Sequence, residues 1–355
     1  MRSVRVIITG AAGFIGSNLA EQLLSEGHEV VGVDNFDDYY SGKTMFLERS
    51  NDHPYFSMVR GDILDLELMK RTMRGADVVV HLAAQAGVRF SVKDPLKSHM
   101  VNVVGTLNVL LASLEGGVKR VVNSSSSSVY GNIGRRPVTE NDPVRPVSPY
   151  ATSKLAAEIY CRQFYELYGL DTVSLRYFTV YGPRQRPDMA IRIFTERILK
   201  GLPPHIYGDG EQSRDFTYVS DVVAAIRSAM TAPDLKGAAI NICGGKPITV
   251  NRLVQELQDA CGRRDLGPVY LPAQPGDVDH TWGDSALAMK LLRWKARTST
   301  REGLRKYVEW YRGSEERRTV LGGEPSSGTS IANVVISEPL HRPPSEMSSD
   351  VSRGM

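Results

Sequence analysis

The first half of the chain alternates short runs of apolar, mostly β-branched residues with segments in which apolar residues recur every three or four positions. Short apolar runs are typical of buried strands, and the longer period is typical of amphipathic helices. The runs interpreted as strands cover residues 4–8, 29–33, 55–59, 77–81, 119–123 and 172–176. Because strands that alternate with helices form βαβ units, the pattern predicts an α/β fold with a doubly wound parallel sheet.

About halfway along the chain, prolines and loops become more frequent and the periodic segments become shorter. We expect residues 1–182 to form the parallel-sheet domain, with residues 217–245 returning to it. Residues 183–216 and 246–312 are expected to form a smaller, mixed α/β domain that binds the substrate. Residues 313–355 are rich in Ser, Gly, Pro and Glu and contain few large apolar side chains, so we predict that this tail is disordered.

Charge and composition argue against several classes of function. The formal net charge over 355 residues is only +3, without a polybasic block, so we expect no binding to nucleic acid. No apolar run approaches the ~20 residues needed to cross a bilayer, and the first residues lack the pattern of a signal peptide. The three cysteines lack CxxC spacing and the histidines lack metal-ligand spacing. We therefore expect a cytoplasmic protein with free thiols, no membrane contact and no metal.

Three glycines directly follow the first predicted strand and open the first predicted helix. Gly10, Gly13 and Gly16 allow a tight turn in which backbone N–H groups at a helix N-terminus approach a pyrophosphate. Asp34 ends the second strand, where a carboxylate accepts hydrogen bonds from ribose hydroxyls and repels a 2′-phosphate. This order of strand, glycines, helix and acid predicts a Rossmann domain that binds NAD rather than NADP. The alternative for Asp34 is a solvated carboxylate at a strand end.

Tyr150 and Lys154 lie four positions apart, which places them on one face of a predicted helix. A free phenol has a pKa near 10. A neighbouring ammonium and the positive charge of a nicotinamide would stabilise the phenolate, so that the tyrosine can act as a general base near neutral pH. Residues 124–128 are serines at the end of the fifth strand, where a hydroxyl can hydrogen-bond the reacting oxygen.

Residues near other strand ends complete the predicted cofactor site. The Asp62 carboxylate could meet the adenine amino group, and small residues after the fourth strand would let a flat cofactor lie against the backbone. Asn102 could orient the lysine or its water. The residues predicted to contact the cofactor are Gly10, Gly13, Phe14, Ile15, Gly16, Asp34, Asn35, Asp62, Ile63, Leu82, Ala83, Ala84, Asn102, Tyr150 and Lys154.

Over residues 4–312 the chain resembles extended short-chain dehydrogenases/reductases of the nucleotide-sugar epimerase and dehydratase group. The resemblance implies that Tyr150 takes the proton of a sugar 4-hydroxyl, assisted by Lys154 and Ser126, while C4 passes hydride to a recycled NAD. The 4-keto sugar then turns, and hydride returns to its other face. The resemblance also implies a homodimer in which the helices near 101–114 and 151–168 pair into a four-helix seam.

The two residues before Val129 bear on which reaction of that group is catalysed. Members that dehydrate the sugar carry Asp-Glu at these two positions, and members that decarboxylate UDP-glucuronate carry Ser-Glu. This chain has Ser127 and Ser128, without a carboxylate, which leaves net epimerisation. Its segments 178–183 and 186–190 resemble UDP-glucuronate 4-epimerases, so we expect conversion of UDP-glucuronate to UDP-galacturonate.

By that resemblance, Arg186 and nearby hydroxyls would surround the sugar carboxylate, because a guanidinium suits bidentate recognition of carboxylates. The alternative for Arg186 is a surface cation. Arg214 would hold the diphosphate. Arg192 could contact the phosphates or the carboxylate, and the alternative for it is a solvated cation on a helix. The residues predicted to bind substrate are Arg89, Ser126, Ser127, Ser128, Tyr150, Thr179, Arg186, Arg192, Tyr207, Arg214 and Asp277, of which Tyr207 and Asp277 would lie at the uridine.

Three other functions stay open at this point. The segment 208–218 looks more like epimerases of uncharged sugars, so a UDP-glucose/UDP-galactose or N-acetylhexosamine 4-epimerase is the main alternative. A UDP-glucuronate decarboxylase lacks its glutamate here. A non-catalytic NAD-binding protein would not need the Tyr150, Lys154 and Ser126 constellation.

Overall fold

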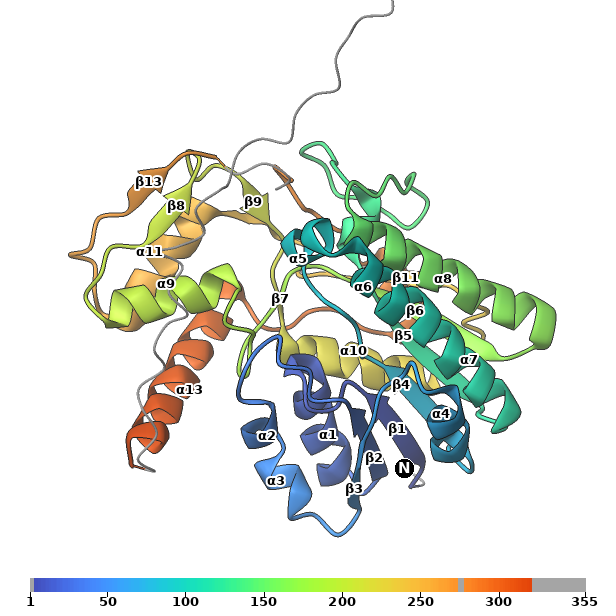
Figure 1. Ribbon diagram of the computed structural model, residues 1–355. Coiled ribbons are helices and arrows are strands. Elements are labelled where there is room, and N and C mark those ends of the chain that lie inside the picture. Colours follow the sequence, from blue (N-terminus) through green and yellow to red (C-terminus); the bar gives the residue numbers. More distant parts are fainter. Residues whose placement is uncertain (1–2, 274–277, 321–355) are drawn as a thin grey trace, which may run out of the picture. The chain divides into compact units, whose positions relative to one another are not determined.

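Seven parallel strands form one sheet in the order β11-β6-β5-β4-β1-β2-β3 (Figure 1). The computed structural model describes residues 3–273 and 278–320, with side chains to residue 314. The strands of this sheet are β1 (Arg5–Thr9), β2 (Glu29–Asp34), β3 (Phe56–Arg60), β4 (Val78–His81), β5 (Arg120–Ser126), β6 (Asp171–Tyr177) and β11 (Ala239–Ile242). All six predicted strands are present, and the predicted Rossmann fold is confirmed.

The strand order reverses beside β1. From β1 the chain continues outward to β2 and β3, and it then returns to place β4, β5 and β6 on the other side. Doubly wound sheets bind ligands at this switch point, outside the carboxyl ends of the strands. The end of β1 is therefore where a site is expected.

Helices cover both faces of the sheet (Figure 1). One face packs against α1 (Phe14–Ser25), α10 (Val219–Thr231) and α12 (Ala286–Leu292). The other packs against α4 (Leu66–Met73), α7 (Gly105–Glu115) and α8 (Pro149–Tyr168). The fully buried apolar runs of the strands follow from this coverage, because each side chain meets a helix on its own face.

Residues at both ends of α8 are of the types that begin and end helices. The Ser148 side chain accepts a hydrogen bond from the Ala151 N–H, and Pro149 occupies the first turn. Gly169 ends the helix with a φ of 70°, in the left-handed region that favours glycine. These signals place Tyr150 and Lys154 in the first two turns of a long, well-capped helix.

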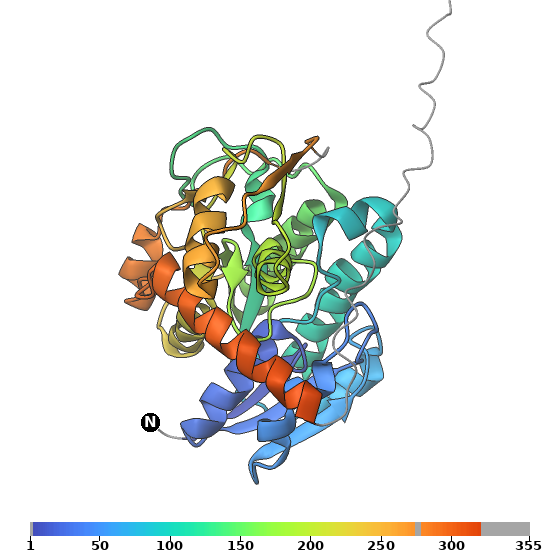
Figure 2. The same cartoon turned by 90° about the vertical axis from the view of Figure 1, so that its left-hand side faces the viewer.

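A second group of elements lies beside the sheet, facing the viewer in Figure 2. It contains α9 (Ala190–Leu199), α11 (Val250–Cys261) and the first turns of α13, around a separate apolar core. Its short strand pairs join β8 (His205–Tyr207) to β13 (Val269–Leu271), β9 (Ser213–Arg214) to β12 (Ile248–Thr249), and β7 (Val180–Tyr181) to β10 (Thr217–Tyr218). Between the parts of this group, α10 and β11 return to the main sheet.

Several short helices complete the described fold. They are α2 (Lys43–Phe46), α3 (Glu48–Asn51), α5 (Val88–Lys93), α6 (Pro95–His99), the π-helix η1 (Met100–Val104) and the 3₁₀ helix η2 (Ser127–Tyr130). The last helix, α13, covers Thr300–Val320 and so extends past residue 312, after which the predicted tail begins. The Glu-Glu-Arg-Arg run at 315–318 favours a helix, and the glycine-rich composition begins only after it. Residues 321–355 lie outside the described residues.

In the described residues, no helix combines the length and apolar character needed to cross a membrane. The three cysteines, Cys161, Cys243 and Cys261, are all buried and free of disulfide bonds.

Candidate active site

A cavity of about 600 Å³ opens at the carboxyl ends of β1, β2, β4 and β5. The predicted cofactor and catalytic residues that line it are Gly10, Gly13, Phe14, Ile15, Gly16, Asp34, Asn35, Asp62, Ile63, Leu82, Ala83, Ala84, Ser126, Tyr150 and Lys154. The predicted sugar-binding residues that line it are Ser127, Ser128, Thr179 and Arg186. The structure therefore brings most of the predicted site together in one cavity.

The glycine turn between β1 and α1 has no room for side chains. A Cβ atom on Gly16 would lie 2.2 Å from the Gly10 carbonyl oxygen, and one on Gly10 would lie 2.7 Å from the Ala83 backbone nitrogen. Both contacts involve backbone atoms, which cannot rotate aside. Gly10 also has a φ of 73°, a conformation that other residues rarely adopt. The turn thus presents bare backbone at the start of a helix, which suits a pyrophosphate.

Asp34 is buried at the end of β2 and is not a solvated carboxylate. Its Oδ1 accepts a hydrogen bond of 2.8 Å from the Phe36 N–H, and its Oδ2 accepts one of 3.1 Å from the Ala12 N–H. Burial raises the pKa of Asp34, while the nearby Lys43 ammonium and these N–H groups lower it. Asn35 donates a hydrogen bond of 2.8 Å to Asp62, which ties together two of the predicted adenosine contacts.

Tyr150, Lys154 and Ser126 converge from α8 and β5. The Lys154 Nζ donates a hydrogen bond of 2.8 Å to the Ser124 carbonyl, and burial lowers the pKa of Lys154 to about 8. Burial raises the pKa of Tyr150, whereas the Arg186 guanidinium and a hydrogen bond with Ser126 lower it. The Arg186 guanidinium therefore favours the Tyr150 phenolate, an effect that the sequence analysis did not predict.

The chain matches the NAD-dependent epimerase/dehydratase family over residues 6–243. It is 38% identical over 314 residues to a UDP-glucuronate 4-epimerase of Thermodesulfobacterium geofontis, covering 86% of this chain and 95% of that protein. A solved UDP-glucuronic acid 4-epimerase of Bacillus cereus, in complex with UDP-glucuronic acid and NAD, is 34% identical with a TM-score of 0.82 and covers 87% and 99% of the two chains. A UDP-glucose 4-epimerase of Thermotoga maritima with UDP-glucose is 39% identical, with a TM-score of 0.82 and the same coverage.

The chain belongs to the NAD-dependent epimerase/dehydratase family. This confirms the predicted family and the predicted NAD cofactor. The site fits that cofactor on its own geometry, since the glycine turn excludes side chains where a pyrophosphate would lie. Asp34 would face the adenosine ribose, and the cavity wall near Tyr150 would receive the nicotinamide.

In this family member, Asn102 supports the cavity from behind and is not among the residues that line it. It lies in η1, and its side chain accepts a hydrogen bond of 2.7 Å from the Gln85 N–H. Its amide nitrogen donates to the Gln85 carbonyl at 3.0 Å and to the Ser153 Oγ at 2.9 Å. These bonds from η1 join the loop after β4 to α8.

Four predicted substrate residues lie outside the cavity lining. Arg192 is buried on the inner face of α9, 5.3 Å from the Tyr311 ring centre, because that helix packs its inner face against α13. Arg214 donates hydrogen bonds to the Ser213 and Asp279 carbonyls. The remaining two are Arg89, on the exposed side of α5, and Tyr207, on β8. A further predicted residue, Asp277, lies outside the described residues.

The segment after β2 contributes cavity residues that the sequence analysis missed. Tyr39, Tyr40 and Lys43 line the cavity. The Tyr39 hydroxyl donates a hydrogen bond of 3.2 Å to Asp188, which lies beside the predicted sugar site. The signal available in the sequence was a polar and aromatic loop directly after Asp34, ended by Gly42, whose φ is 96°.

Behind the site, a buried ion pair joins α8 to the sheet. Arg176 on β6 donates to Glu158 on α8 at 2.7 and 3.0 Å, and Ser125 on β5 also donates to Glu158. Arg176 also donates to the Tyr130 hydroxyl at 2.9 Å, which in turn donates to Asn241 at 2.7 Å. The network connects the helix that carries Tyr150 to three neighbouring strands. Apart from Ser125, one of the five serines at the end of β5, none of its residues was predicted.

Proposed function

We propose that the chain is a UDP-sugar 4-epimerase that converts UDP-glucuronate to UDP-galacturonate. The observation that carries the proposal is the position of Arg186, whose guanidinium shares the cavity with Tyr150 and Thr179. A uronate carries its carboxylate on C5, next to the reacting C4, so a cation near the base is where it would be needed. The resemblance of the chain to UDP-glucuronate 4-epimerases supports the same substrate.

In this proposal Tyr150 accepts the proton of the sugar 4-hydroxyl and later returns one to the 4-keto oxygen. Ser126, which hydrogen-bonds Tyr150, is placed to hold that sugar oxygen. Lys154 is anchored on the Ser124 carbonyl at the end of β5. NAD, when bound, supplies a reversible hydride acceptor for C4. Both sugar faces must reach the same tyrosine, so the site must let the 4-keto sugar turn.

The Arg186 guanidinium already shows how it binds a carboxylate. Its Nε lies 3.0 Å from Asp188 Oδ1 and its Nη2 lies 3.2 Å from Asp188 Oδ2, which is a bidentate pairing. The Arg186 side chain is only 19% exposed, whereas that of Asp188 is 44% exposed. A substrate carboxylate could replace Asp188, because the aspartate can turn to water at little cost and the arginine cannot.

A cation at the position of Arg186 would also affect the stability of the 4-keto intermediate. The 4-keto form of a uronate is a β-keto acid, which loses CO₂ when the bond to its carboxylate aligns with the carbonyl. A bidentate guanidinium fixes the torsion of the carboxylate, and the serines at 127 and 128 supply no acid to assist decarboxylation. The site therefore favours epimerisation over loss of CO₂.

The proposal is tested by replacing Arg186 with alanine and comparing UDP-glucuronate with UDP-glucose. Because Arg186 also lowers the pKa of Tyr150, the variant should need a higher pH for the phenolate with either sugar. The informative quantity is therefore the ratio of kcat/KM for UDP-glucuronate to kcat/KM for UDP-glucose. Each value is measured in the pH range where it no longer changes with pH. We expect this ratio to fall at least ~10-fold, which is the size of one lost charged hydrogen bond, and UDP-4-keto-pentose to appear by mass spectrometry.

The matched control removes the competing carboxylate instead of the cation. In Asp188→Asn the guanidinium keeps its charge and loses its internal partner, so KM for UDP-glucuronate should fall or stay unchanged. If Arg186→Ala lowers kcat/KM for both sugars in equal proportion, the uronate assignment is wrong.

The alternative substrate is an uncharged UDP-hexose, and one observation favours it. Asp188 already neutralises Arg186, so a neutral sugar would leave the charge of Arg186 paired. The likeness to the Thermotoga maritima UDP-glucose 4-epimerase supports this alternative. Under it, the wild-type protein would turn over UDP-glucose well and UDP-glucuronate poorly.

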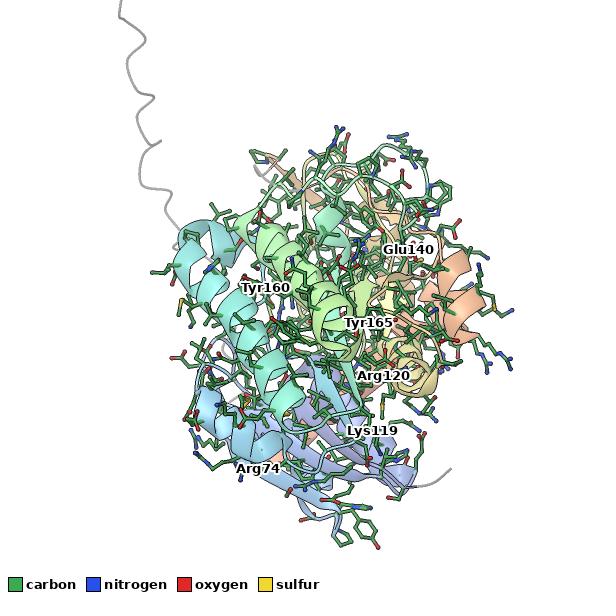
Figure 3. All side chains as sticks on the ribbon, turned by 90° about the vertical axis from the view of Figure 1, so that its right-hand side faces the viewer. Arg74, Lys119, Arg120, Glu140, Tyr160 and Tyr165 are labelled. Atoms are coloured by element: carbon green, nitrogen blue, oxygen red, sulfur yellow. The ribbon has the colours of Figure 1, made fainter. Side chains whose placement is uncertain are left out.

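We further propose a homodimer through the outer faces of α7 and α8. The two helices lie side by side (Figure 3), and large apolar side chains stand exposed on them and on the adjoining α6. Leu96, Ile159 and Leu167 are 69%, 50% and 71% exposed. A second copy presenting the same face would cover them symmetrically.

For this surface, Ile159→Glu is expected to convert the dimer to a monomer, because dimerisation would bury an unpaired carboxylate. Light scattering after size-exclusion chromatography measures the mass. Leu202→Glu is the matched control, since Leu202 is 45% exposed but lies in the loop after α9. A wild-type protein that is already monomeric would contradict the proposal.

A further inference from the structure

A lysine shares the predicted ribose end of the cavity with Asp34. The Lys43 Nζ lies 3.9 Å from the Asp34 Oδ1, and both residues line the cavity. The Lys43 side chain is only 13% exposed. Its ammonium also lies 5.3 Å from the centre of the Tyr40 ring. A buried ammonium therefore stands beside the carboxylate that is expected to exclude a 2′-phosphate.

The position of Lys43 does not depend on Asp34 alone. Lys43 is the first residue of α2, directly after Gly42, whose φ of 96° sets the direction of the chain. The Tyr40 ring supports the ammonium through a cation–π contact, a kind of interaction that strengthens with burial. If Asp34 lost its charge, Lys43 would stay in place as a cation, and the carboxylate left near it would be Asp37, whose pKa Lys43 lowers.

A second lysine in the same cavity has a different environment. Lys97 pairs with Asp37 at 2.9 Å and lies over the Phe90 ring. Its charge is matched by a carboxylate other than Asp34. Asp37 lies near both lysines, but it hydrogen-bonds Lys97. Removing the Asp34 charge therefore takes away the carboxylate that pairs with Lys43 and leaves Lys97 paired with its own.

We propose that Lys43 is a second determinant of cofactor choice, a phosphate-binding cation that Asp34 keeps neutralised. With Asp34 charged, the pair is balanced and a 2′-phosphate meets a carboxylate. With a neutral residue at position 34, Lys43 offers an ammonium at the site of that carboxylate, and a phosphate monoester is the anion that would match it. The cofactor preference then rests on one charge, whichever sugar the enzyme acts on.

The test compares one single variant with two double variants on protein stripped of cofactor. The NAD and NADP dissociation constants are measured by calorimetry with no sugar present. In Asp34→Asn, the NADP affinity relative to NAD should rise at least ~10-fold over wild type, by the strength of a charged hydrogen bond. In Asp34→Asn/Lys43→Met that gain should disappear. In Asp34→Asn/Lys97→Met, the matched control, it should remain.

Two checks keep the outcome decisive. Asp34→Ser is a second neutral variant for the case in which Asp34→Asn does not fold, and thermal unfolding reports folding for each protein. If neither neutral variant gains affinity for NADP relative to NAD, or if the gain survives Lys43→Met, the proposal is wrong. Because no sugar or turnover is involved, failure here would leave the proposed epimerase function untouched.

Discussion

Replacing Tyr150 with phenylalanine is expected to lower kcat by ~10²-fold or more, the usual contribution of a general base. In the proposed mechanism the phenol takes the 4-hydroxyl proton, and its hydroxyl is the only group that the substitution removes. The ring remains, so the cavity keeps its shape. NAD binding, measured by calorimetry, should change little, because the glycine turn and Asp34 are untouched.

Tyr160→Phe is the matched control for this result. Tyr160 lies on the same helix (Figure 3) but is not among the residues that line the cavity, so the kcat of Tyr160→Phe should stay close to that of wild type. Turnover of Tyr150→Phe close to that of Tyr160→Phe would remove Tyr150 from the role of base. A loss of NAD binding together with kcat would instead point to a structural role.

The second large effect is expected at Glu158, which is buried behind the site. Replacing it with leucine should lower the free energy of unfolding by about 3–5 kcal/mol, because Arg176 is then left as a buried charge without its carboxylate. Ser125 also loses its acceptor. Urea unfolding followed by circular dichroism measures the change.

Two variants define what the Glu158 result means. Glu158→Leu/Arg176→Met removes both charges and should recover most of the lost stability, because no unpaired charge remains. Glu166→Leu breaks the exposed pair with Arg162 on the same helix and should cost little. If Glu158→Leu is no more destabilising than Glu166→Leu, the buried pair does not hold α8 to the sheet.

The sequence alone determined the features that depend on local spacing. Most of the strands are indicated by continuous apolar runs, because they are covered by helices on both faces, whereas the edge strand β3 is only partly buried. The glycine turn, Asp34 at the end of β2, and the Tyr150–Lys154 pair one helical turn apart are set by residues close together in the chain. These residues were expected to lie close together, because the carboxyl ends of parallel strands meet at one edge of the sheet.

Only the tertiary structure decided which side chains meet across separate segments. Arg186 could be assigned to the sugar from its motif, but its pairing with Asp188 and its effect on the pKa of Tyr150 depend on how a loop folds over the cavity. Arg192 is six residues farther along and turns into an apolar core, because α9 packs that face against α13. Lys43 reaches Asp34 through an irregular loop that no periodicity describes. Such contacts depend on the path of the loops and on the packing between elements, which local spacing does not record.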